Sequence, residues 1–162
     1  MPDAVISNTT PILYLHKIGR IELLKQLYGQ ITIPEQVVSE LAAGGIRFPE
    51  GATTKWAMRK SIPILKSLQV IPDLGLGEAG AISLALENPG GSLLLLDDKL
   101  ARRIANLNRL KVTGTAGVLL KAKEKGLISE VKSLLGDLIG AGFYLRKEHQ
   151  ETLCRLAGER FS

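Results

Sequence analysis

The chain is poor in cysteine, with the single residue Cys154 among 162. One cysteine excludes a disulfide framework and any zinc site built from cysteines. It also favours a reducing compartment, so we expect the protein in the cytoplasm. Aromatic residues make up only 4% of the chain, so the core has to be built from aliphatic side chains.

Long apolar runs are missing too. Residues 93–96 are intensely apolar, but four residues are far too few to span a bilayer. The first residues offer only Ala4, Val5 and Ile6 before polar positions, so we expect neither a signal peptide nor a membrane segment. A G-x-S-x-G elbow, a Walker A loop and a Cys–His pair are also absent from the sequence.

What is present is typical of one globular domain. Hydrophobic residues make up 45% and charged residues 23%, which excludes intrinsic disorder. The length is sufficient for a core that needs no metal or disulfide to fold. We expect a core over about residues 1–125 and a helical C-terminal extension over 126–162.

Charge is divided unevenly along the chain. Residues 1–98 hold 8 Lys and Arg against 10 Asp and Glu, whereas residues 99–162 hold 13 against 6. An acidic half joined to a basic half suits a phosphate-rich ligand held near a metal site. The alternative interpretation is that the basic residues simply form solvated helical faces.

Apolar periodicity predicts strands that alternate with helices. The predicted strands cover 4–7, 31–33, 68–71, 92–96 and 110–113. The predicted helices cover 11–18 with Thr10 as N-cap, 21–28, 34–43, 53–60, a segment that follows Gly77, 99–108, 114–125, 128–141 and 147–156. Such alternation predicts a mostly parallel sheet with helices on both faces, and these sheets bind ligands at the carboxyl ends of their strands.

Polar side chains follow three of the predicted strands and should meet at one edge of the sheet. They are Asn8 and Thr9, Asp97 and Asp98, and Thr113 with Thr115. Glu40 lies beside the apolar stripe of its helix, and Glu78 lies in the first turn of its own. Each acid alone has an ordinary structural explanation: Glu40 as a surface residue, Glu78 at a helix N-terminus and Asp98 as a helix cap.

Taken together, these acids predict an oxygen-rich site for a hard cation such as Mg²⁺ or Mn²⁺. An ion of this kind activates water and stabilises charge that develops on a phosphoryl group. Lys99, Arg102 and Arg103 follow the acids directly and are placed to steer a phosphate backbone towards them.

Several motifs, in order, resemble PIN-domain proteins, and more narrowly a PIN-like subgroup related to VapC-type toxins. The motifs are ISNTTPIL from Ile6, Glu40 within PEQVVSEL, Gly75-Leu76-Gly77-Glu78-Ala79, LLLDDK from Leu94 and Thr113-Gly114-Thr115. The resemblance covers about residues 4–125 and continues into the helical tail. It implies a three-layer α/β fold with a mostly parallel central sheet.

The same resemblance implies a metal-dependent ribonuclease. In PIN domains, acids bind one or two Mg²⁺ or Mn²⁺ ions, and a metal-activated water cleaves RNA to leave a 3′-hydroxyl and a 5′-phosphate. Glu40, Glu78 and Asp98 match the ligand positions, and Asp97 adds a nearby carboxylate. Thr9 or Thr10 matches a supporting hydroxyl, and Thr115 lies close by. Related toxins form homodimers and are silenced by a small antitoxin protein.

One position departs from the family pattern: Asn8 stands where PIN nucleases carry aspartate. An amide oxygen still ligates a metal, but one negative charge is lost. The departure predicts weaker metal affinity, a single occupied site, or no activity.

Two alternatives to a ribonuclease remain open at this point. The first is a non-catalytic PIN-like module that binds RNA or a protein, which the Asn8 substitution favours. The second is a dinucleotide-binding domain, since Gly75, Gly77 and Gly80 form G-x-G-x-x-G and Asp97 follows at a suitable distance.

Overall fold

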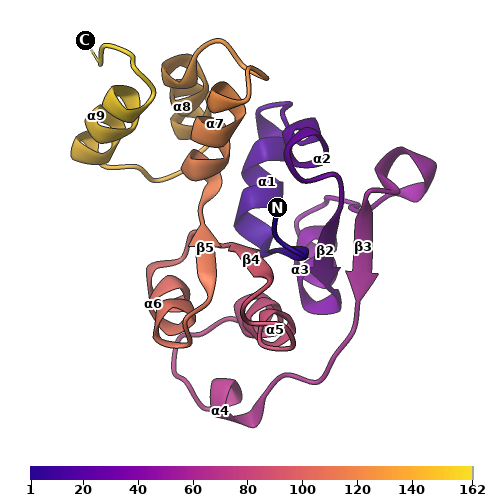
Figure 1. Cartoon of the computed structure of the whole chain (residues 1–162). Coiled ribbons are helices and arrows are strands. Elements are labelled where there is room, and N and C mark those ends of the chain that lie inside the picture. Colours follow the sequence, from indigo (N-terminus) through magenta and orange to yellow (C-terminus); the bar gives the residue numbers. More distant parts are fainter. Residues whose placement is uncertain (162) are drawn as a thin grey trace.

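The computed structural model describes residues 1–161, with the backbone alone at Ala52 and Thr53. Within this range, five strands form one parallel sheet in the order β3-β2-β1-β4-β5 (Figure 1). The strands are β1 (Ala4–Ser7), β2 (Ile31–Pro34), β3 (Ala57–Lys60), β4 (Ser92–Leu95) and β5 (Lys111–Thr113). The predicted α/β architecture with a parallel sheet is therefore confirmed.

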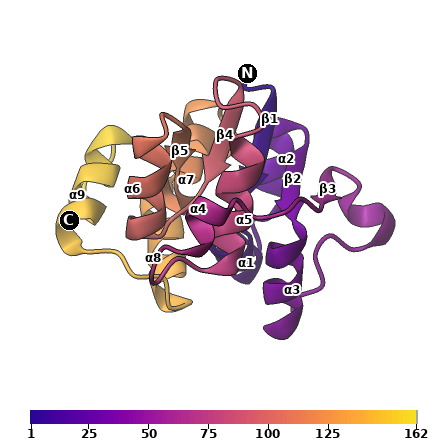
Figure 2. The ribbon, with the colours of Figure 1, turned by 90° about the horizontal axis from the view of Figure 1, so that it is seen from below.

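Helices cover both faces of the sheet. They are α1 (Thr9–Lys17), α2 (Glu22–Tyr28), α3 (Glu35–Ala43), α4 (Lys66–Gln69), α5 (Leu76–Ala85), α6 (Lys99–Leu107), α7 (Thr115–Glu124), α8 (Val131–Gly140) and α9 (Lys147–Leu156). In Figure 1, α1, α2, α7 and α8 lie above the sheet, and α5 and α6 lie below it. Figure 2 views the same layers from below, with α4 and α5 towards the reader.

The central strands are apolar because both of their faces are covered. β1 pairs with β4 from Ala4↔Ser92 to Ser7↔Leu95. Side chains alternate between the two faces of the sheet. Val5 and Leu95 belong to the core between the sheet and α1 and α7, and Ile6 and Leu94 belong to the core between the sheet and α5 and α6. Two separate aliphatic cores thus hold the sheet in place from opposite sides.

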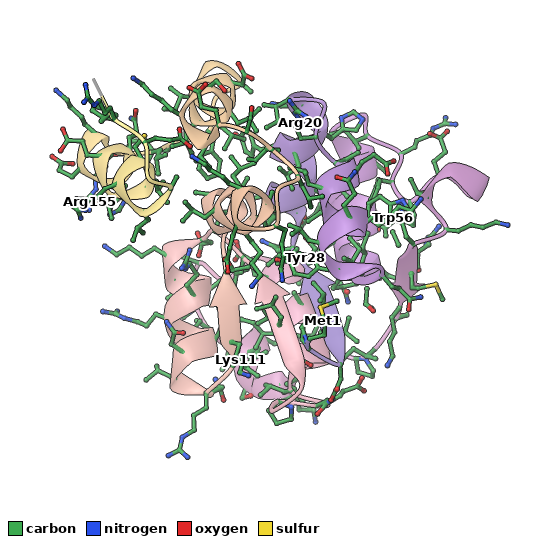
Figure 3. All side chains as sticks on the ribbon, turned by 45° about the horizontal axis from the view of Figure 1, so that its top comes forward. Met1, Arg20, Tyr28, Trp56, Lys111 and Arg155 are labelled. Atoms are coloured by element: carbon green, nitrogen blue, oxygen red, sulfur yellow. The ribbon has the colours of Figure 1, made fainter. Side chains whose placement is uncertain are left out.

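Residues 53–71 are where the sequence predictions were wrong. The helix predicted over 53–60 is instead a 3-10 turn (Gly51–Thr54) followed by the edge strand β3, which pairs with β2 from Ile31↔Ala57 to Pro34↔Lys60. Met58, Arg59 and Lys60 suit helices, but pairing with β2 overrides that preference. Trp56, labelled in Figure 3, lies just before this strand and is buried. Its ring packs edge-to-face with that of Phe48.

The strand predicted over 68–71 is also wrong, because residues 66–69 form the short helix α4. Leu68 is buried against the α5 side of the fold while Val70 is 78% exposed, and so short an apolar alternation does not separate strand from helix. A third correction concerns Thr10, since α1 begins at Thr9 and its N-cap is Asn8.

The C-terminal extension is fastened to the core by Glu159. Its carboxylate accepts hydrogen bonds from Lys123 Nζ at 2.7 Å and from the backbone N–H groups of Val131 at 2.7 Å and Lys132 at 2.9 Å. Burial alone would raise the pKa of Glu159, but the bonds from Lys123 and the two N–H groups outweigh it, so the pKa lies below its usual range. One side chain therefore joins the chain end to α7 and to the start of α8.

Replacing this carboxylate should weaken the fold in a pH-dependent way. Glu159→Gln should lower the free energy of unfolding by roughly 1–3 kcal/mol near pH 7. Because the folded-state pKa is depressed, the contribution is present above the unfolded pKa of about 4.3 and disappears as the pH falls through the folded value. The difference from wild type should shrink below about pH 4 in urea unfolding. Glu151→Gln, exposed on α9, is the matched control, and equal losses for both variants would contradict this role.

Candidate functional site

The ends of three strands meet at one edge of the sheet. The Asn8 N–H donates to the Leu95 carbonyl at 3.0 Å, and the Leu96 N–H donates to the Thr113 carbonyl at 2.9 Å. These bonds continue the strand pairing past β1, β4 and β5. The loops that carry Asn8, Asp97 and Asp98 therefore lie side by side, as the parallel sheet predicts.

Glu40 brings α3 into the same site. Its Oε2 accepts a hydrogen bond from the Thr9 hydroxyl at 2.5 Å, and its Oε1 accepts one from the Gly77 N–H at 2.9 Å. A carboxylate is stabilised by N–H groups at the start of a helix, which here is α5. Thr9 and Gly77 thus orient Glu40 from two different elements.

The glycines of the G-x-G-x-x-G segment serve the packing of α3 against α5. A Cβ at Gly77 would lie 2.6 Å from Glu40 Oε2, and one at Gly80 would lie 2.7 Å from Gln36 Oε1. The segment follows α4 rather than a strand. Because Glu40 already occupies the Gly77 N–H, an anionic pyrophosphate would meet a carboxylate there. The geometry therefore favours close helix packing over dinucleotide binding.

Glu78 lies within reach of the negative charges of Asp98 and Glu40. Its Oε2 accepts a hydrogen bond from the Gly75 N–H at 2.9 Å. Burial raises the pKa of Glu78, the Gly75 bond opposes that rise, and the charges of Asp98 and Glu40 raise the pKa further. The three acids predicted from separate parts of the sequence thus share one electrostatic environment, which a cation would relieve.

Asn8 has an unused acceptor in this environment. The residue is 3% exposed, and its Oδ1 is buried without a hydrogen-bond partner in the described part of the chain. Asparagine is among the best N-cap residues, yet the Asn8 side chain makes no capping bond to α1. A buried polar atom without a partner is unfavourable, so a ligand that reached this oxygen would relieve that cost.

Asp97 and Asp98 have different surroundings although they are adjacent. Asp97 accepts bonds from the Thr115 N–H at 2.9 Å and the Thr115 hydroxyl at 2.6 Å, and Thr115 is fully buried. Burial raises the pKa of Asp97, and the Thr115 bonds and the Arg102 charge oppose the rise. Asp98 is exposed and caps α6 by accepting the Ala101 N–H at 2.9 Å through Oδ2. Asp97 therefore fastens β4 to α7, and Asp98 faces outwards.

The remaining predicted residues are divided between the site and its surroundings. Lys99 and Arg103 are exposed on α6, whereas Arg102 is half-buried and its charge acts on Asp97. Thr10 is half-buried in the first turn of α1. Sequence reasoning missed the backbone donors of Gly75 and Gly77. The Gly75-x-x-Glu78 spacing of a capping box was the signal for the first of them.

The acids are not gathered into a closed set of ligands, but several oxygens of the kind that a hard cation prefers remain free. Among residues 1–161, no group of three or more His, Cys, Asp or Glu side chains is gathered closely enough to hold a metal. Within the same range, Glu78 Oε1, Asp98 Oδ1 and Asn8 Oδ1 accept no hydrogen bond. Carboxylate and amide oxygens are the ligands that Mg²⁺ and Mn²⁺ prefer, so the orphaned Asn8 oxygen fits such an ion.

The fold and this acidic edge define a parallel α/β protein with an oxygen-rich site. A family profile described as a PIN domain matches residues 4–159, so the chain belongs to the PIN-domain family. PIN domains are usually metal-dependent nucleases, and membership indicates a nuclease-type function in general. No curated protein and no solved structure matches the chain significantly. Within the part of the chain that the structure describes, no helix is long and apolar enough to cross a membrane.

Restoring the missing charge should strengthen metal binding. Asn8→Asp should tighten Mn²⁺ binding at least about tenfold in calorimetric titration, because it adds a negative charge at the buried position. Asn106→Asp, on the exposed face of α6, adds the same charge away from the site and is the control. Equal affinity of wild type and Asn8→Asp would show that Asn8 does not touch the ion.

Thermal unfolding should distinguish the roles of the two adjacent aspartates. Asp97→Ala should lower the free energy of unfolding by about 1–3 kcal/mol, since Thr115 loses its acceptors, but the gain in Tm on adding Mn²⁺ should remain. Asp98→Ala should lose most of that gain. The reverse pattern would assign the ligand role to Asp97.

Proposed function

We propose that this protein is a Mg²⁺- or Mn²⁺-dependent endoribonuclease whose ion is held by Asn8, Glu40, Glu78 and Asp98. The observation that carries the proposal is the buried, unpartnered Asn8 oxygen at the same sheet edge as Glu78, on which the charges of Asp98 and Glu40 act. Membership of the PIN family supports the same conclusion. A divalent ion bound there makes water a better nucleophile and neutralises charge on the phosphoryl group.

The chain's own residues have separate tasks in this proposal. Asn8, Glu78 and Asp98 offer free oxygens to the ion, and Thr9 with the Gly77 N–H holds the Glu40 carboxylate in place. Asp97 keeps the loop of Asp98 attached to α7 through Thr115. With an amide at position 8, the site has one negative charge fewer than the family pattern, so we propose that it holds one ion.

The basic face of α6 supports RNA as the substrate. Residues 99–111 contain five basic side chains and no acidic one. Lys99 and Arg103 are exposed one helical turn apart, and Figure 3 shows nitrogen-tipped side chains that project outwards from α6. α6 begins directly after Asp98, so a phosphate backbone that follows this face is led to the acids.

A toxin role is the finer part of the proposal. It rests on the resemblance to VapC-type toxins, which also supports a homodimer and a small antitoxin as partners. The lone Cys154 is buried and unpaired, which supports a reducing compartment such as the cytoplasm.

A non-catalytic RNA-binding module is the second candidate. It is favoured by Asn8 at the usual aspartate position and by carboxylates that are already hydrogen-bonded to Gly75, Gly77 and Ala101. In such a module the acids would have a structural role, and changing them would leave RNA affinity nearly unchanged.

Cleavage assays separate the two candidates. Purified protein should cut single-stranded RNA with Mn²⁺ or Mg²⁺ and not with EDTA, and Glu78→Gln should reduce the rate at least about a hundredfold, because it changes a ligand to the ion. Glu148→Gln, exposed on α9, is purified identically and should cut like wild type. Absence of cleavage by folded protein across varied RNAs and metals would favour the binding module. Cleavage that survives in Glu78→Gln would refute the assigned site.

A further inference from the structure

A cavity of about 470 Å³ is lined by residues of α3, α4 and α5 and of the loops before and after α4. Six of its lining residues carry the argument: Gln36, Ile62, Ile64, Leu74, Leu76 and Ala79. The volume falls within the range of about 300–1,000 Å³ that is typical of small-ligand sites.

The walls of this cavity are uncharged and combine apolar side chains with amide groups. None of its lining residues is acidic or basic. Gln36 and Gln69 are the polar members of the lining. The Gln69 Nε2 donates to the Ile64 carbonyl at 2.8 Å, whereas the Gln36 side chain makes no hydrogen bond within residues 1–161. Its Oε1 lies against the Gly80 backbone, which leaves an amide donor and acceptor at the wall. The cavity therefore suits a neutral ligand with apolar faces and a polar edge.

The cavity and the acidic site share two helices, α3 and α5. Gln36 lies one turn before Glu40 on α3, and Leu76 and Ala79 lie on either side of Glu78 on α5. A ligand seated there is thus next to whatever the acids hold. α6, which begins directly after Asp98, offers cations for phosphates.

We propose that this cavity takes one unpaired nucleobase of an RNA strand whose phosphate lies at the acidic site. The inference rests on the proposed function and specifies its substrate as single-stranded RNA. A base is planar and uncharged, with apolar faces for Ile62, Ile64 and Leu76 and a hydrogen-bonding edge for Gln36. A phosphate has no cation there, and an apolar peptide side chain would leave the Gln36 amide without a partner.

Binding in EDTA tests the cavity without cleavage. The probes are a short single-stranded RNA, its perfect duplex and a ribose-phosphate strand of equal length without bases. Wild-type protein should bind the single strand roughly ten- to a hundredfold tighter than the abasic strand, in line with the contribution of one seated base. The duplex should bind as weakly as the abasic strand, because its bases are paired and stacked.

Two variants connect this preference to the cavity. Leu76→Ser removes an exposed wall residue, and Gln36→Leu removes the amide; both should bring the single-strand to abasic affinity ratio close to one. Leu156→Ser on α9 is the matched control, since Leu156 is 68% exposed and Leu76 is 66% exposed. Thermal unfolding of each variant verifies that it is folded.

The outcomes distinguish this inference from the proposed nuclease function. Equal affinity for the single strand and the abasic strand, or an unchanged ratio in both folded cavity variants, overturns the nucleobase site even if Mn²⁺-dependent cleavage is found. The cavity would then be assigned to an apolar protein segment. A base-dependent affinity that Leu76→Ser removes supports the site even if no metal produces cleavage, and in that case only the catalytic proposal fails.

Discussion

The parallel pairing of β1 with β2 on one side and β4 on the other is the constraint on which the rest of the structure depends. Parallel strands present all their carboxyl ends at one edge. The loops after β1 and β4 therefore lie together, although Asn8 and Asp98 are ninety positions apart in the chain. The apolar cores on the two faces hold this pairing, so the edge is a rigid support for polar side chains.

Negative charge at that edge is tolerated because backbone N–H groups donate hydrogen bonds to the carboxylates. Glu40, Glu78 and Asp98 each accept an N–H at or near the start of a helix, from Gly77, Gly75 and Ala101 respectively. These donors offset part of the repulsion among the acids. The pKa of Glu78 is raised mainly by burial, and the charges of Asp98 and Glu40 raise it further. The acids are thus held in place by the fold itself, and their field would favour a cation.

The surface around the acids is divided by chemistry. α6 carries cations and no acid, whereas the cavity beside α4 is uncharged and lined by apolar and amide side chains. A nucleic acid strand has the same division between charged backbone and uncharged bases. This match connects the proposed nuclease site to the proposed nucleobase site, which are next to each other on α3 and α5.

The sequence alone determined the alternation of strands and helices, the parallel sheet and the candidate acids, because apolar periodicity and strand-end polarity are local signals. It failed over residues 53–71, where pairing with β2 and burial of Leu68 decide the outcome. Only the tertiary structure distinguished the role of Asp97 from that of Asp98. The hydrogen-bond partner of Asp97 is Thr115, and β5 and the turn into α7 bring Thr115 next to the end of β4. The tertiary structure alone showed the unpartnered Asn8 oxygen, since burial and the absence of a partner depend on every element around a residue.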